Sequence, residues 1–527
     1  MSVKQQTTNS EVDERLAALL TNANAVRVIT QAVESTIGPK GLDTMLVDNN
    51  GDVVVTNDGV TILEMMEVNH PAAQMLIKIA KAQQEEVGDG TTTATIMAGA
   101  MVNEGVNQVL KGVPVIKIIE GLALGINLAL KKLDELTIEV SLADEEILKN
   151  VALISGRGNA DIAELVVEAA KLIGQEKLLN SSFKLGQTVR ALEGAENKVI
   201  SGIIIEKEPL NGEMPKKLQD VKALFIDDAL EPEEVDKEAL GTEAGFRRHL
   251  ELQEEFKDNL RKITEIGVNL VLVDRAVHVL AEEFLTEQQI MVVQRVPNKE
   301  LRLAAEHLGA KMLKRTGLKK EPAELAKYVG EATEAYYNEK LKYICIAGGK
   351  GKPLATILVG ASTEEIVGER ERIAKDASSA VQAALKGGVV PGGGSLELAL
   401  SRGIEEGRKE AKGMAIYGLD CVIAALQKPF SQIVYNAGFN PLEKLGDVQA
   451  AQIEHNSSSI GIDCDTGEVQ DMLKSGVYDP APVKKYALQA AGEVSQAILR
   501  IDTIIKKKES RDYVPGQDNR YRGDRFD

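Results

Sequence analysis

The fold of this chain is constrained most by a change of hydrophobic pattern along its 527 residues. Both ends carry apolar residues at helical spacing, as in Leu16, Leu19, Ala23 and Val26. From about residue 199 to 358, buried-strand runs such as 268–273 alternate instead with helices predicted near 276–286 and 299–308. The pattern predicts an α/β unit with a partly parallel sheet, inserted into a helical unit that both chain ends build together.

Short signals refine this organisation. Strand-like runs at 45–48 and 53–56 flank an Asn-Gly turn, which predicts a hairpin. Helices are predicted at about 70–87 and 91–110, and Pro114 opens another. A highly charged helical stretch at about 230–262 predicts a solvated projection that lies outside the α/β core.

Composition excludes several classes of protein. With 62 Lys plus Arg against 80 Asp plus Glu, the net charge is −18, which argues against nucleic-acid binding through overall positive charge. Aromatic residues make up 3% and Trp is absent, so base-stacking platforms are not expected. The three distant cysteines, without a CxxC motif, predict free thiols in a reducing cytoplasm. No apolar run reaches about 18 residues, so no membrane partner is expected.

The sharpest local motif is GDGTTT at residues 88–93, between two predicted helices. Exposed N–H groups and the dipole at a helix N-terminus favour an anion, and glycines permit close approach of a phosphate. Asp89 beside them suits Mg²⁺, which prefers carboxylate and phosphate oxygens. The alternative is an ordinary turn between helices with a Thr cap; the chain has no Walker motif.

Other candidate residues are weaker when taken singly. The TIGPKG turn at 36–41 is explained equally by a helix stop, and Asp58 by an ordinary Asp-Gly turn. The glycines at 392–394 suit either a backbone nest for a ligand or a hinge. Asp376 lies at the margin of an apolar helical stripe, where a carboxylate is usually exposed.

Together and in this order, the motifs TIGPKG (36–41), TNDGVTIL (56–63), GDGTTT (88–93) and VVPGGG (389–394) resemble those of the chaperonin family. The resemblance covers about residues 10–510. The inserted stretch at 230–262 resembles the built-in lid of the group II type, found in archaea and the eukaryotic cytosol, or of the similar bacterial subgroup sometimes called group III.

The resemblance implies a multidomain fold in three parts. An all-α equatorial ATP-binding domain is expected from residues 1–137 and 388–527. A small α/β intermediate hinge domain is expected from 138–200 and 354–387. An α/β apical substrate-binding domain is expected from 201–353, with the helical protrusion at about 230–262.

The resemblance also implies roles for individual residues. Asp376 and Asp58 are the expected catalytic carboxylates at the attacking water, and Asp89 is the expected Mg²⁺ ligand. Arg157 falls near a position where the archaeal type has a lysine that senses the γ-phosphate. The expected nucleotide contacts are Thr36, Ile37, Gly38, Pro39, Gly90, Thr91, Thr92, Thr93, Gly393, Asp463, Cys464 and Asp479.

The implied function is an ATP-dependent, homo-oligomeric double ring that captures non-native proteins and encloses them under its own lid. ATP and Mg²⁺ are the implied cofactors, with K⁺ as an additional candidate, and no separate lid protein is expected. Two alternatives stay open: a nucleotide-regulated protein-binding scaffold without productive turnover, and a metabolic phosphotransferase, for which no acceptor motif is apparent.

Overall fold

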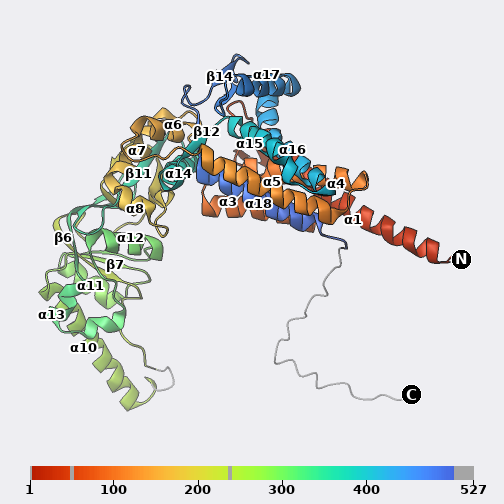
Figure 1. The fold of residues 1–527 in the computed structure, drawn as a ribbon. Coiled ribbons are helices and arrows are strands. Elements are labelled where there is room, and N and C mark those ends of the chain that lie inside the picture. The colour runs from red at the N-terminus through yellow and green to blue at the C-terminus, as the bar shows by residue number, and fades with distance from the viewer. Residues whose placement is uncertain (1–2, 48–50, 52, 236–239, 504–527) are drawn as a thin grey trace, which may run out of the picture.

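The structure, a computed structural model, describes residues 3–47, 51, 53–235 and 240–503. Residues 236–239 of the predicted projection and 504–527 of the predicted equatorial domain therefore lie outside the described residues. The described chain forms equatorial, intermediate and apical parts, which follow one another along an elongated, bent molecule (Figure 1). The domain boundaries themselves stay a prediction.

The equatorial domain is built from both chain ends, as the hydrophobic pattern predicts. Helices from the two ends pack side by side around one buried cluster that includes Val26, Met97, Leu122, Leu419 and Leu488. Its helices are α1 (Val3–Glu34), α2 (Gly59–Met65), α3 (Pro71–Glu86), α4 (Thr91–Leu110), α5 (Val115–Leu136), α15 (Ser395–Glu406), α16 (Ile416–Asn436), α17 (Pro441–Glu454) and α18 (Ala481–Leu499).

Short two-stranded sheets accompany these helices. The predicted strand pairing is confirmed, because β1 (Thr44–Val47) pairs antiparallel with β2 (Val53–Thr56) and Met45 lies opposite Val55. Residues 48–50 and 52 of the predicted Asn-Gly turn lie outside the described residues. A second pair joins β12 (Val389–Pro391) to β15 (Tyr478–Pro480), and a third joins β13 (Ile460–Ile462) to β14 (Val469–Asp471). The β12–β15 pair ties the segment just before the glycines at 392–394 to the segment just before α18.

The intermediate domain packs helices on a small mixed sheet. Its strand β11 (Thr356–Ala361) pairs parallel with β3 (Val189–Glu193) and antiparallel with β4 (Lys198–Ile200). The long helix α14 (Glu364–Gly387) runs from this sheet to the equatorial domain, where it contacts α18. The remaining helices are α6 (Glu145–Ser155), α7 (Ala160–Ile173) and α8 (Gln175–Leu179).

The apical domain contains a six-stranded sheet with the order β5-β10-β9-β6-β7-β8. The pairs β6–β7 and β7–β8 are parallel and the others antiparallel, which confirms the predicted partly parallel sheet. Its strands are β5 (Gly202–Ile205), β6 (Lys217–Ile226), β7 (Leu270–Val273), β8 (Met291–Val293), β9 (Gly330–Asn338) and β10 (Tyr343–Gly349), and its helices are α10 (Glu243–Glu265), α11 (Val279–Glu287), α12 (Asn298–Leu308) and α13 (Pro322–Leu325).

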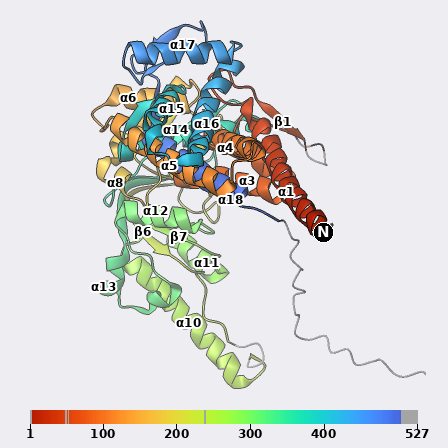
Figure 2. The same ribbon diagram turned by 45° about the vertical axis from the view of Figure 1, so that its right-hand side comes forward.

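Helix α10 projects from this sheet, away from the equatorial helices, in both views (Figures 1 and 2). The prediction that the whole stretch 230–262 lies outside the core is wrong at its two ends. Leu230 is fully buried and forms a bridge to Val277, and Phe256 and Leu260 enter the core beneath β7. Phe256 and Leu260 lie four positions apart on one face of α10, and burial of that face anchors the helix.

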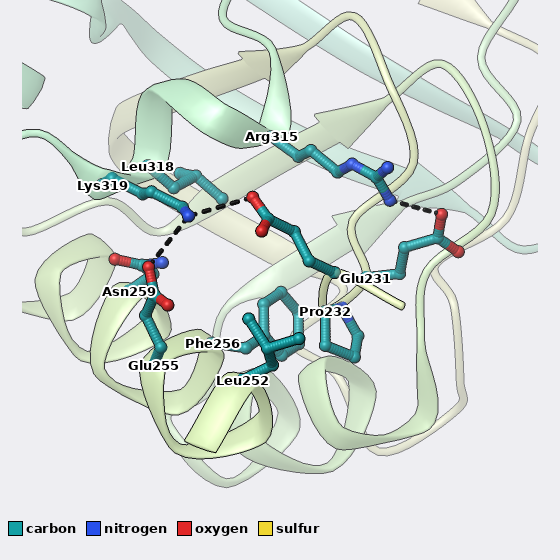
Figure 3. Close-up of a pocket in the computed structure, with 10 residues that line it drawn as sticks. Glu231, Pro232, Leu252, Glu255, Phe256, Asn259, Arg315, Leu318 and Lys319 are labelled. Carbon is teal, nitrogen blue, oxygen red and sulfur yellow. Dashed lines mark hydrogen bonds and ion pairs between the residues drawn. The ribbon is translucent and has the colours of Figure 1, made fainter. Parts of the chain in front are cut away.

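Ion pairs close over the root of this projection. Lys319 Nζ lies 2.9 Å from Glu233 and 3.0 Å from Glu255, so it joins the start of the projecting segment to α10 (Figure 3). Arg315 Nη1 lies 2.7 Å from Glu231 on the other side. Within the described residues, no helix is both long and apolar enough to cross a membrane.

Candidate functional site

The GDGTTT motif forms a tight turn between α3 and α4. Gly88 and Gly90 have φ values of 74° and 78°, a left-handed conformation that favours glycine. Gln83 Nε2 donates hydrogen bonds to the carbonyl oxygens of Asp89 and Val483, at 2.8 and 3.1 Å. A Cβ atom on Gly90 would lie only 2.5 Å from Val483 Cγ1, so the turn is pressed against the start of α18.

Asp89 points into the junction between the equatorial and intermediate domains. Its carboxylate accepts hydrogen bonds from the Gly90 N–H at 2.6 Å and from Ser155 Oγ, at the end of α6, at 2.9 Å. Burial raises the pKa of Asp89 above its ordinary value despite these two hydrogen bonds, and the charge of Asp479 adds to the rise. A bound cation would offset the cost of burying the ionised Asp89 carboxylate, so this position suits a cation.

The first turn of α4 lies against the start of α2. Its N–H groups have no acceptor within the helix and are free to bind an anion. A Cβ atom on Gly59 would lie 2.6 Å from Thr92 Oγ1 and 3.4 Å from Thr91 Oγ1, so only glycine permits this approach. The approach brings Asp58, the N-cap of α2, beside the threonines of the motif.

Asp376 is buried, in contrast to the exposed position that its place on the apolar stripe favours. Burial raises its pKa well above the ordinary value, and the charges of Asp89 and Asp58 raise it further, while Arg372 opposes the shift. Asp58 and Asp89 are therefore each within electrostatic reach of Asp376. The first two come from the N-terminal segment and the third from α14, more than 280 positions later in the sequence.

The TIGPKG loop is held over α4 and α16 by apolar contacts. Ile37, Ile96 and Ile433 form one buried cluster, against which Cys464 packs. Asn436 Nδ2 donates to the Ile37 carbonyl oxygen at 2.9 Å, which fixes the loop. The loop that contains Thr36, Gly38 and Pro39 is thereby brought to Cys464 through Ile37.

Asp479 lies beside Gly392, the residue that precedes Gly393. Val390 pairs with Asp479 in the β12–β15 sheet, and a Cβ atom on Gly392 would lie 3.2 Å from Asp479 Cγ. Gly393 has a φ of 64° and sits against Met472. The pairing of two short strands thus brings the glycine turn that contains Gly393 to the segment that carries Asp479.

The carboxylate of Asp463 is occupied by its own turn. Asp463 Oδ1 accepts hydrogen bonds from the N–H groups of Asp465 and Thr466, at 2.7 and 3.2 Å. The structure thus brings Cys464 to the TIGPKG loop, whereas the Asp463 side chain serves to shape the turn.

Arg157 is placed beside the carboxylates but is paired elsewhere. Its Nη1 lies 3.1 Å from Glu369 Oε1, and its charge, like that of Arg372, opposes the rise in the pKa of Asp376. Its φ of 53° holds it in a conformation uncommon for a residue with a side chain.

The sequence analysis did not identify Lys484, a buried lysine that contacts the site residue Asp479. Lys484 Nζ lies 2.7 Å from Glu397 Oε1 and 2.8 Å from Asp479 Oδ2. Burial alone would lower the pKa of Lys484, but the charges of Asp479 and Glu397 outweigh it and raise that pKa. No local signal marks Lys484, because its two partners come from α15 and β15. A second missed residue, Arg372, stands one helical turn before Asp376, at a spacing typical of ion pairs.

Replacing Lys484 with methionine is expected to destabilise the equatorial domain by about 3 kcal/mol, because it leaves the buried Glu397 charge unpaired. The urea midpoint of unfolding, followed by circular dichroism, measures the loss. The double variant with Glu397→Gln removes that charge and is expected to recover part of the midpoint. An unchanged midpoint in the single variant would contradict the pairing.

The donor set fits a magnesium nucleotide. Among the described residues no group of three or more His, Cys, Asp or Glu side chains is placed to hold a metal ion by itself. Mg²⁺ is ordinarily held by one or two carboxylates together with phosphate oxygens and water. The buried carboxylate of Asp89, beside the N-terminal end of α4, matches that chemistry.

Comparison with known proteins identifies the family. The model described as the TCP-1/cpn60 chaperonin family matches residues 29–509. The chain belongs to this family. A thermosome subunit of Pyrococcus abyssi is 36% identical over 502 residues, which cover 92% of this chain and 90% of that protein. A thermosome subunit of Methanocaldococcus jannaschii is 35% identical over 521 residues, covering 96% and 95%.

A solved chaperonin has the same fold. The crystal structure of a group III chaperonin in the open state matches with a TM-score of 0.85 and 47% sequence identity, covering 94% of this chain and all of that one. The resemblance drawn from the four motifs is thereby confirmed, together with the multidomain chaperonin fold.

Proposed function

We propose that this chaperonin subunit hydrolyses ATP and uses the cycle to enclose non-native proteins in a homo-oligomeric double ring. The observation that carries the proposal is that Asp58 and Asp89 lie near Asp376, beside the N-terminal end of α4. The projection at about 230–262, whose root is buried and whose α10 extends outward, supports its role as a built-in lid that needs no separate lid protein.

The proposed nucleotide site is assembled from segments that the fold brings together. Backbone N–H groups and hydroxyls of residues 90–93 bind phosphate oxygens, and Asp89 holds Mg²⁺. Residues 36–39, Gly393 and Asp479 surround the ribose and base, together with Asp463 and Cys464. K⁺ is a further candidate cation.

The reaction then depends on two carboxylates. Asp376 orients the attacking water and accepts its proton at a carboxylate oxygen, and Asp58 helps to orient the same water. Bound Mg²⁺ supplies positive charge that offsets the charge developing on the phosphate oxygens. Burial of Asp376 excludes bulk water from this step.

Domain closure is proposed to gate hydrolysis. Asp376 lies on α14 of the intermediate domain, whereas Asp58 and Asp89 belong to the equatorial domain. A movement of α14 therefore makes or breaks the catalytic arrangement, and the same movement carries the apical sheet and α10. Nucleotide state and lid state are coupled in this way.

The proposed partners are non-native proteins and further copies of the chain, without nucleic acid or membrane, and the proposed compartment is the cytoplasm. The three cysteines are all free thiols in the structure, as suits a reducing compartment.

Refolding of a denatured client protein tests the proposal. We expect recovery of client activity with ATP but not with a non-hydrolysable analogue, and back-to-back rings in electron micrographs of the same sample. Equal recovery with both nucleotides would favour the alternative of a nucleotide-regulated scaffold without productive turnover. Absence of phosphate release would exclude the ATPase altogether.

A further inference from the structure

Arg372 lies between two of the carboxylates at the domain junction. Its Nη1 atom is 3.5 Å from Asp376 Oδ2, on its own helix α14, and 3.7 Å from Asp58 Oδ1, at the start of α2. All three side chains are largely withdrawn from solvent, with 18% of Arg372, 12% of Asp376 and 14% of Asp58 exposed. One guanidinium nitrogen is thus shared by carboxylates of the intermediate and equatorial domains.

The other terminal nitrogen of Arg372 is held in the same two-sided manner. Its Nη2 atom donates to Glu369 Oε1 of α14 at 2.5 Å and to Asn57 Oδ1, just before α2, at 3.4 Å. The guanidinium plane therefore faces two acceptors from each domain. Lysine cannot reproduce this arrangement, because its ammonium is a compact charge without a planar fork.

The surrounding charges explain why a cation is needed at this point. Asp58 and Asp89 each repel Asp376 in a largely buried environment. Two other basic side chains nearby have different positions: Arg157 shares Glu369 with Arg372, and Lys484 pairs with Glu397 and Asp479. Arg372 is thus the basic side chain that contacts both Asp58 and Asp376 among the described residues.

We infer that Arg372 is a positioning residue that holds Asp376 against Asp58 and docks α14 on the equatorial domain before nucleotide arrives. The inference rests on the proposed ATPase, since Asp376 and Asp58 act there on the water. Arg372 itself does not touch the reacting atoms. Loss of the Arg372 side chain would leave the proposed phosphate-binding groups of α4 in place but would misplace the Asp376 carboxylate.

The test compares Arg372→Met with Arg372→Lys and with the control Arg370→Met. Arg370 lies on the same helix and is 21% exposed, but it pairs with Asp161 of α7, within the intermediate domain. Steady-state ATPase is expected to show a kcat about 10- to 100-fold lower for Arg372→Met, because misplaced catalytic groups lose about that much rate. KM is expected to stay within about twofold of wild type because the α4 contacts are intact. Arg372→Lys recovers part of kcat, and Arg370→Met leaves it unchanged.

Hydrogen exchange of the nucleotide-free protein gives a second readout that needs no ATPase. The amide of Thr61, which donates to Asp58 Oδ2 at 2.9 Å, reports on the start of α2. Peptides covering 57–62 are expected to exchange faster in Arg372→Met, but at the wild-type rate in Arg370→Met. Arg372→Lys retains the charge, so it serves as the folded test variant if the methionine variant does not assemble.

The outcomes separate the inference from the proposed function. Wild-type kcat and wild-type exchange in both Arg372 variants would overturn the positioning role. A raised KM with unchanged kcat would overturn it as well, because Arg372 would then act on binding. Absence of ATP hydrolysis by the wild-type protein would refute the proposed function, whereas the exchange experiment would still decide whether Arg372 docks α14.

Discussion

Asp376→Ala is expected to bind ATP as the wild type does and to hydrolyse it about 100- to 10,000-fold more slowly, the usual contribution of a positioned acid–base group. Asp376 belongs to α14 and not to the N-terminal end of α4, the proposed phosphate site, so its removal leaves the proposed binding groups untouched. Binding is measured by calorimetry and turnover by phosphate release.

Glu371→Gln is the matched control for Asp376. Glu371 lies on the same helix and pairs with Lys375 at 2.5 Å, where both side chains are more exposed than Asp376. We expect near-normal turnover in this variant. Normal steady-state hydrolysis in Asp376→Ala would remove Asp376 from the mechanism, and a matching loss in Glu371→Gln would indicate a general disturbance of α14.

Asp89→Ala is expected to abolish the dependence of nucleotide binding on Mg²⁺. Loss of even an outer partner of a metal ligand costs about 10- to 100-fold in metal affinity, so losing the ligand itself should weaken Mg-ADP binding by at least about tenfold. Calorimetry with ADP, in the presence and absence of Mg²⁺, measures the difference between the two conditions. An undiminished effect of Mg²⁺ would contradict the proposed role.

Asp89→Asn separates this role from stability. The pKa of Asp89 is raised in the folded protein, so the folded state holds its proton more tightly than the unfolded state does. Ionisation therefore costs stability as pH rises above the ordinary pKa. In the asparagine variant Oδ1 still accepts from the Gly90 N–H, and the side-chain NH2 donates to the Ser155 hydroxyl in place of accepting from it, without the charge. Its nucleotide-free melting temperature at neutral pH is therefore expected to equal or exceed that of wild type, while its Mg²⁺ response is lost.

Local patterns predicted much of the fold. The helices at about 70–87 and 91–110 match α3 and α4 closely, because their ends carry a proline and a glycine turn that act within a few residues. The β1–β2 hairpin was predicted for the same reason. The shared equatorial body followed from helical spacing at both chain ends, although that spacing says nothing about which helices touch.

The candidate site was predictable where backbone geometry requires a particular residue. Gly88, Gly90 and Gly393 adopt left-handed conformations, so their motifs are visible in the sequence. Asp58 and Asp89 lie next to such turns and were found with them. Asp376 has no such marker, and its place on the helix favoured an exposed side chain; only the resemblance to chaperonins singled it out.

The sequence by itself determined the helical ends, the inserted α/β unit and the glycine turns of the site, because these depend on residues close together along the chain. The tertiary structure decided which charges are buried and paired. Arg372 meets Asn57 across 315 positions, Lys484 is enclosed by Glu397 and Asp479, and the root of α10 joins the apical core. Such contacts depend on how whole elements pack, and burial in a low-dielectric interior then sets their strength.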